Sequence, residues 1–249
     1  MQTRIIYRIA SLVFGALIIL TGSLSCQEEL PTPGLPETAR EWVEASARHH
    51  DPEGRWQAFE ANFEVETIAP AGWSYTNNLH LNRALDTFSR TIQSGGYPLV
   101  QVVGPSGCSA TWPNPDATEA QLRRNGLLED PCDYILYRRD FYEFLVGIPM
   151  IALEGETSFR QNPDLVNAFG TECIEIELTF AAGGLTWFLY INPSTYRLQA
   201  AKFFGRNGGG EWLSYEDYIS FDGFILKQSQ RWYNIDGVTE INRDEIRWE

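Results

Sequence analysis

The second half of the chain alternates apolar and polar residues, and this pattern constrains the fold more than any other feature. Between positions 173 and 180 every second residue is apolar, and Glu175, Glu177 and Thr179 stand between them. A period of two predicts a β-strand with one apolar face. Asp222-Gly223 and Asp236-Gly237 mark tight turns between further alternating segments. Sequential hairpins of this kind predict an antiparallel meander.

The first half adds further strands and supplies the helices. Alternation predicts strands over 56–67, 73–83, 85–93, 97–103, 173–180, 187–192, 197–204, 212–221, 224–233 and 238–248. Helical spacing and capping residues predict helices over 37–50, 117–126 and 131–146. We therefore expect a mainly β (α+β) fold: a curved antiparallel sheet or half-barrel of about ten strands, with helices covering its concave face.

The N-terminus has the pattern of an export signal. Arg4 and Arg8 precede an apolar run from Ile9 to Leu20, which is shorter than the roughly 20 residues that a spanning helix needs. Small residues then lead to Cys26. This arrangement resembles a bacterial lipoprotein signal, in which the cysteine becomes the lipid-modified first residue of the mature chain. An ordinary signal peptide and an uncleaved anchor are the alternatives.

This signal predicts both the organisation and the location of the protein. We expect a signal peptide over 1–25, a Pro-rich tether over 26–36 and a single domain over 37–249. The lipid on Cys26 would anchor the exported domain to the cell envelope, at the outer membrane. Glu28 and Glu29 fit a surface-export signal only loosely, so the periplasmic and surface faces both stay open.

The charge excludes one class of partner. The predicted mature chain loses two of the 19 basic residues and keeps all 33 acidic residues, which gives a net charge of −16. Phosphate backbones and anionic headgroups would repel such a chain, so we expect no nucleic-acid binding and a membrane attachment that depends on acyl chains. Eight Trp, 11 Tyr and 14 Phe suit a sheet that faces a bulky apolar group, or rings that only fill the core.

Three cysteines remain after Cys26. Cys108 and Cys132 flank a loop-and-helix stretch in an exported protein, and we expect them to form a disulfide. Cys173 lies in an alternating segment and is expected to be a small buried apolar group. No pair of cysteines has the spacing of a zinc site.

Several segments together resemble one family. They are the run from His50 to Trp56, the Cys108 and Cys132 pair, and the runs 142–150 and 187–193. In combination they resemble Bacteroidetes-type lipoproteins with a LolA/LolB-like fold, that of the outer-membrane lipoprotein carriers. The resemblance implies a half-barrel of antiparallel strands wrapped around helices, and in the characterised carriers that cavity holds acyl chains. The predicted N-terminal lipid argues against a freely diffusing shuttle here.

The polar clusters have simpler interpretations than catalysis. His49 and His50 are adjacent on a predicted helix, point about 100° apart and cannot easily share one metal ion. Glu175 and Glu177 share a strand face that is expected to be solvated. The run 104–108 lacks the strand–turn–helix context of a serine nucleophile. We expect no catalytic set, no cofactor and no metal site.

These observations favour a non-enzymatic binding module whose cavity takes an apolar ligand, an acyl chain or a lipoprotein tail. One alternative is a structural lipoprotein with a filled core that acts with a protein partner in an envelope complex, and another is an enzyme on the same scaffold. The sequence leaves open which strand face points inward. The candidate lining residues are Phe63, Val65, Ile176, Leu178, Phe188, Tyr190, Phe204 and Trp232.

Overall fold

The computed structural model describes residues 35–249 except 95, 126, 128–130, 161, 181–184 and 205–208. The predicted signal peptide, the lipidation site Cys26 and most of the predicted tether lie outside the described residues. Residues 36–249 form one compact unit. Within the described ranges, every helix is too short or too polar to reach across a bilayer.

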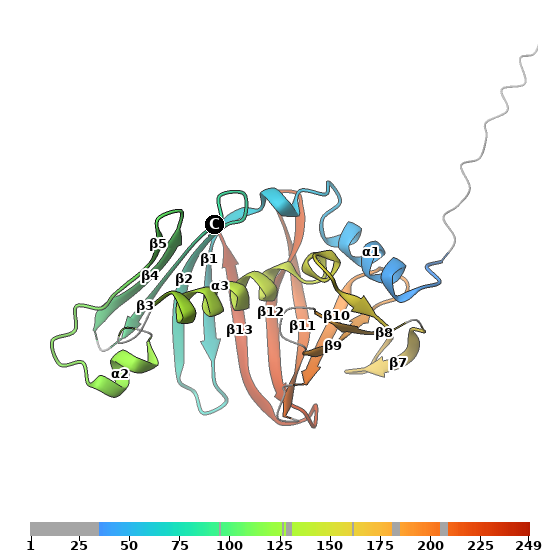
Figure 1. Ribbon diagram of the computed structural model, residues 1–249. Helices are drawn as coiled ribbons and strands as arrows, with labels where there is room; N and C mark the ends of the chain where they lie inside the picture. The colour runs from blue at the N-terminus through green and yellow to red at the C-terminus, as the bar shows by residue number, and fades with distance from the viewer. Residues whose placement is uncertain are drawn as a thin grey trace, which may run out of the picture. The chain divides into compact units, whose positions relative to one another are not determined.

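One antiparallel sheet of 13 strands dominates the described residues (Figure 1). The strand order is β5-β4-β3-β2-β1-β13-β12-β11-β10-β9-β8-β6, with β7 also paired to β8, and the two ends of the sheet do not meet. The predicted mainly β architecture is confirmed. The strands are β1 (Glu60–Ile68), β2 (Ser74–Asn82), β3 (Thr87–Ser94), β4 (Tyr97–Gly104), β5 (Gly107–Thr111), β6 (Ser158–Phe159), β7 (Asp164–Ala168), β8 (Thr171–Thr179), β9 (Thr186–Ile191), β10 (Leu198–Phe204), β11 (Gly210–Phe221), β12 (Phe224–Asn234) and β13 (Glu240–Trp248).

The three strands beyond the expected ten are β5, β6 and β7. They contain five, two and five residues, too few for a pattern of period two to stand out. Two of them, β6 and β7, pair with β8, and β5 pairs with β4 at the other end of the sheet. The expected count of about ten was therefore low because short edge strands carry almost no periodicity.

Three helices accompany the sheet: α1 (Ala39–His50), α2 (Glu119–Arg124) and α3 (Pro131–Gly147). They occupy the predicted segments, and the bounds differ by one to two residues at most ends. Thr38 and Glu41 begin α1 with a capping box, in which each side chain satisfies a free backbone N–H of the first turn. Figure 1 shows α3 running across the strands of the sheet. Two short 3₁₀ turns, η1 (Trp56–Ala58) and η2 (Met150–Leu153), link these elements.

The main core lies between the concave face of the sheet and the helices α1 and α3. Ile135, Leu145 and Val146 of α3 meet the apolar residues of β1, β8, β9 and β13 there. A second, smaller core lies on the opposite face, where Cys173 and Tyr190 are buried. The alternating strands therefore bury apolar side chains on both faces of the sheet, in a large core on the concave face and in a small cluster on the opposite face.

His50 fixes the end of α1 to the sheet. Its Nδ1 lies 2.7 Å from the carbonyl oxygen of Ile225 in β12, and its Nε2 accepts a hydrogen bond of 3.2 Å from the backbone N–H of Leu198 in β10. These partners need a neutral ring with the proton on Nδ1. Burial, together with the charge of Lys227, lowers the pKa of His50 to about 3. The imidazole therefore acts as a structural connector, as expected for a helix end.

This depressed pKa makes the fold sensitive to acid. Below pH 6.5 the unfolded chain binds a proton at His50 that the folded chain does not bind, so stability falls as the pH decreases. Between pH 7 and pH 4.5 we expect this group to cost about 2.5 kcal/mol of the free energy of unfolding. Urea unfolding at both pH values measures how much more stable the wild type is than His50→Gln. This difference in the free energy of unfolding should be smaller at pH 4.5 than at pH 7.

The matched control is His80→Gln. His80 lies on β2 beside Asn62, so this variant also removes an imidazole but leaves the connection between α1 and the sheet intact. A stability difference between wild type and His50→Gln that is the same at both pH values would contradict the assignment.

Candidate functional site: a cleft beside helix α3

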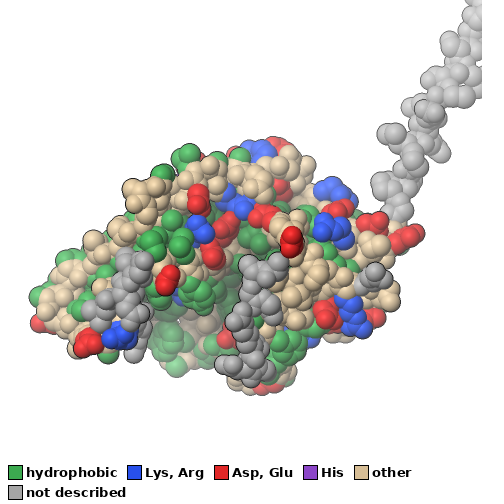
Figure 2. All heavy atoms as spheres, viewed as in Figure 1, with side chains coloured by type: hydrophobic (Ala, Val, Ile, Leu, Met, Phe, Trp, Pro, Cys, Tyr) green, Lys and Arg blue, Asp and Glu red, His purple; other side chains and the backbone are tan. Residues whose placement is uncertain are grey.

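A mostly apolar cleft of about 460 Å³ lies along one flank of α3. Tyr137 and Phe144 supply the helix side, and Ile151 follows from η2. The opposite wall comes from the hairpin of β8 and β9. In Figure 2 hydrophobic side chains gather in a hollow of the face that α3 crosses, and acidic and basic side chains lie above it. The hairpin residues of the wall are Phe180, Leu185 and Trp187.

Cross-strand register builds this wall. Leu178 of β8 pairs with Trp187 of β9, and Trp187 pairs with Phe203 of β10, so the three side chains share the concave face. The Trp187 ring stacks on Phe203 at 4.6 Å between centroids and lies 4.2 Å from Phe144 of α3. The indole therefore joins the sheet to the helix at the base of the cleft.

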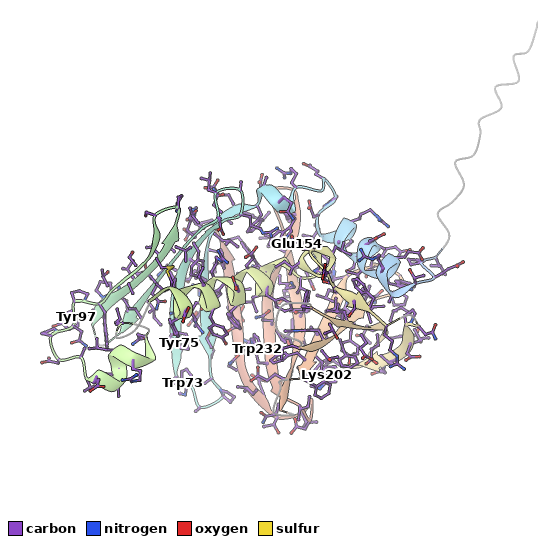
Figure 3. All side chains as sticks on the ribbon, in the orientation of Figure 1. Trp73, Tyr75, Tyr97, Glu154, Lys202 and Trp232 are labelled. Carbon is purple, nitrogen blue, oxygen red and sulfur yellow. A yellow bond between two sulfur atoms is a disulfide. The ribbon has the colours of Figure 1, made fainter. Side chains whose placement is uncertain are left out.

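An ion-pair network forms the polar rim of the cleft. Arg83, in the turn between β2 and β3, contacts Glu143 of α3 at 2.5 Å and Glu154 at 2.8 Å. Its guanidinium also lies 4.7 Å from the centre of the Trp56 ring. Glu154 is labelled in Figure 3 beside the end of α3. Both carboxylates pair with the same guanidinium, which fixes their positions relative to α3 and the β2–β3 turn. Because both are engaged in ion pairs, they are not available as an acid–base pair.

A second, smaller pocket of about 150 Å³ lies on another flank of α3. Its fixed centre is Asp244 of β13, whose carboxylate accepts hydrogen bonds from Thr67 at 2.7 Å and from the indole N–H of Trp232 at 2.6 Å. The side-chain amide of Gln230 donates a third, at 3.0 Å. Three donors satisfy this buried charge, which would otherwise be costly.

A larger cavity, of about 730 Å³, lies elsewhere among the described residues, between the start of α1 and β6. Residues 37–40, 157–160 and 162 line it. The cleft beside α3 is bounded by a helix and a sheet hairpin and has the more apolar lining, so it is the better candidate for an apolar ligand.

The eight lining residues expected from the sequence fall on both faces of the sheet. Phe63, Val65, Ile176, Leu178 and Trp232 belong to the main core on the concave face. Phe188, Tyr190 and Phe204 lie on the opposite face, around the amine of Lys202 at 4.3, 5.8 and 5.5 Å from the ring centres. The structure does not bring the eight together. Two of them, Val65 and Trp232, line the small pocket beside α3, and none lines the larger cleft.

The structure also shows the surroundings of the cysteines and carboxylates that the sequence singled out. Cys108 of β5 and Cys132 of α3 form the expected disulfide, with Cα atoms 5.1 Å apart. Cys173 is a free, buried thiol, and burial raises its pKa to about 11. Glu175 accepts a hydrogen bond from the Tyr190 hydroxyl, and Glu177 pairs with Arg160. In the described ranges no group of three His, Cys, Asp or Glu side chains is arranged to hold a metal.

The residues that do build the cleft were not singled out in the sequence. Phe144 and Trp187 belong to a predicted helix and a predicted strand and to two runs of the family resemblance. Phe180 ends an alternating run, and Leu185 lies outside every predicted element. The signal that the sequence does carry is the alternation within β9, which divides its residues between the two faces of the sheet. Trp187 and Leu189 alternate with Phe188 and Tyr190, and only the register with β8 shows which pair faces α3.

A scan against protein-family models finds no match, and a search of curated proteins finds none either. A search of solved structures returns a LolA superfamily protein from Nitrosomonas europaea, with a TM-score of 0.47 and 14% identity over 84% of this chain and 91% of that one. A DUF1329 family protein from Desulfovibrio piger follows, with a TM-score of 0.42 and 10% identity over 86% and 92% of the two chains.

A third match is the MucA/MucB complex of Pseudomonas aeruginosa, with a TM-score of 0.23 and 8% identity over 81% of this chain and 77% of that one. With TM-scores below 0.5, these similarities support no conclusion about the activity of this chain. The antiparallel sheet itself establishes the mainly β architecture, and membership among Bacteroidetes-type lipoproteins stays a prediction.

The Arg83 network should stabilise the position of α3. Arg83→Met leaves two partly buried carboxylates without their cation, and we expect the free energy of unfolding to fall by about 2 kcal/mol. The matched control is Arg160→Met, because Arg160 pairs with Glu177 in a solvent-exposed position and should cost about 0.5 kcal/mol or less. Urea titration of both variants tests this, and equal losses would contradict the assigned role.

Proposed function

We propose that this chain is a membrane-anchored, non-enzymatic binding protein that holds an apolar ligand, an acyl chain or a lipoprotein tail, in the cleft beside α3. The observation that carries the proposal is the cleft itself: about 460 Å³, walled by Phe144, Leu185 and Trp187. This volume lies within the range of small-molecule sites, about 300–1,000 Å³, and such sites are mostly apolar with a few polar groups.

The polar groups at the cleft favour binding over catalysis. Glu143 and Glu154 both pair with Arg83, so each carboxylate is held in place by an ion pair and the three groups together keep one net negative charge. An apolar ligand gains free energy from burial at about 25 cal/mol per Å² of apolar surface, and the rings of the wall supply such surface. Arg83 and its partners would then close the rim next to the ligand without reacting with it.

One observation favours the alternative of an interaction lipoprotein with a filled core. Ile176 and Leu178 on the concave face are at most 1% exposed, so a large part of this face is packed by the protein itself. On this second hypothesis the cleft would be a surface furrow, and the functional contact would be with an envelope protein. Ligand binding in the cleft separates the two hypotheses.

Leu185→Asp should abolish apolar binding. It places a charge on the wall of the cleft, where an apolar ligand could not compensate it, and we expect the affinity for a fluorescent fatty acid to fall at least about tenfold. Displacement of the probe by oleate measures the affinity. Circular dichroism establishes that the fold is retained.

The matched control is Leu165→Asp on β7, which makes the same chemical change at a side chain that is 60% exposed. This variant should bind the probe as the wild type does. If the wild type takes up no fatty acid, or if both variants bind it equally well, the proposed ligand class is incorrect. Such a result would favour the hypothesis of an interaction lipoprotein with a filled core.

The proposed anchor is the lipid on Cys26. Because the chain carries a net charge of −14, attraction to anionic headgroups cannot hold it at a membrane. Cys26→Ala should therefore move the protein from the membrane fraction to the soluble exported fraction, whereas the conservative change Ser23→Ala should not. Retention of Cys26→Ala in the membrane fraction after a carbonate wash would contradict the anchor.

A further inference from the structure

The small pocket beside α3 contains a cation to which the described residues supply no anionic partner. Arg138 of α3 lines this pocket, and among the residues that the structure describes its guanidinium forms neither an ion pair nor a hydrogen bond. Its contacts are with rings: the Phe141 and Tyr142 centres each lie 5.5 Å away. Its Nε is buried without an acceptor. A cation in this position is oriented by the aromatic rings but not neutralised.

The same pocket contains an anion with no cationic partner. Glu211 of β11 lines it and, within the described part of the chain, makes no ion pair or hydrogen bond. Burial raises the pKa of this carboxyl group. The side-chain oxygen of Asn242, also in the lining, is buried without a donor. The pocket therefore presents a free donor, a free acceptor and a free carboxylate.

Arg138 and Glu211 do not compensate each other, because no ion pair joins them across the pocket. The third charge, Asp244, already accepts three hydrogen bonds. Together the three side chains leave one net negative charge. The walls are aromatic, from Tyr75, Tyr142, Phe141 and Trp232. Figure 3 labels Tyr75 and Trp232 on the strands that α3 crosses.

We propose that this pocket binds a small zwitterion of the phosphoethanolamine type, with its ammonium group at Glu211 and its phosphate at Arg138. Aromatic rings next to a carboxylate are a favourable environment for an ammonium group. An arginine whose guanidinium lies beside rings and lacks a carboxylate partner can direct its N–H donors to a phosphate. The volume of about 150 Å³ limits the occupant to a small headgroup.

The register of the sheet connects this pocket to the apolar cleft. Trp187 of the cleft pairs with Phe203, and Phe203 pairs with Glu211, so the three form one row across β9, β10 and β11 on the concave face. Two strand spacings amount to roughly 10 Å. One amphiphile could therefore place its tail in the cleft and its headgroup in the pocket. Only this link between tail and headgroup rests on the proposed function of the cleft.

Native mass spectrometry of the full chain in uncharged maltoside micelles tests the headgroup. The probes are oleoyl lysophosphatidylethanolamine and oleoyl lysophosphatidylglycerol, which share the tail and the phosphate and differ in the ammonium group. We expect wild type to prefer the first by about tenfold. Glu211→Gln should remove this preference, and Arg138→Gln should weaken binding of both phospholipids.

The matched controls are Glu172→Gln, at an exposed position near the start of β8, and Arg160→Gln, and both should keep the preference. Free O-phosphoethanolamine, added as a competitor, shows whether the zwitterion binds without a tail or only as a lipid headgroup. Equal binding of the two lysolipids by wild type overturns the proposal. A preference that survives in Glu211→Gln, or an unchanged affinity of Arg138→Gln for both lysolipids, also overturns it.

Oleate, which has a tail and no zwitterion, separates this proposal from the preceding one. If oleate binds and the lysolipids are not distinguished, the pocket proposal fails and the cleft stands. If oleate does not bind but O-phosphoethanolamine does, and Glu211→Gln abolishes that binding, the pocket stands and the cleft fails. If none of the probes binds, both proposals fail.

Discussion

The amine of Lys227 holds the end of α3 on the sheet, and both pockets depend on that position. The last carbonyl groups of a helix have no partner within the helix. Lys227, on β12, donates to the carbonyl oxygens of Leu145 at 3.2 Å and Ile148 at 2.6 Å. It is only 2% exposed, and burial lowers its pKa to about 7. The sheet thus supplies the cap that the helix lacks, and this connection sets where α3 crosses the strands.

Two further connections keep α3 from moving along the concave face. The disulfide to Cys108 holds the first turn of the helix at β5, and a loop of this length is worth about 3 kcal/mol through the unfolded chain. Arg83 holds the last part of the helix through Glu143. With its first turn held at β5 and its last turns held by Arg83 and Lys227, α3 can form a rigid wall of two separate pockets. A preorganised wall lowers the entropic cost of binding.

The sequence predicts the sheet well because alternation and turns are local signals, and the hairpins from β8 to β13 follow directly from them. It could not predict which residues face the helix. Phe188 and Trp187 are neighbours with equal apolar character, and only the pairing of Trp187 with Leu178 places the indole at the cleft. Lys227 and Glu211 carry no local signal either, because a charged residue in an alternating strand is the pattern of a solvated face. Their roles come from a helix that lies about 80 residues away in the chain.

The charge of the chain bears on how such a site can recognise a headgroup. A protein with a net charge of −14 repels anionic surfaces, but this field is screened beyond about 8–10 Å at ordinary salt. Within a pocket, where water is largely excluded, two unpaired charges act over a shorter distance and in a medium of lower dielectric constant. Arg138 can then attract a phosphate locally while the rest of the surface disfavours it. A zwitterion is suited both to the pocket and to the overall charge. Its ammonium group compensates Glu211, and the molecule adds no net charge to an acidic protein.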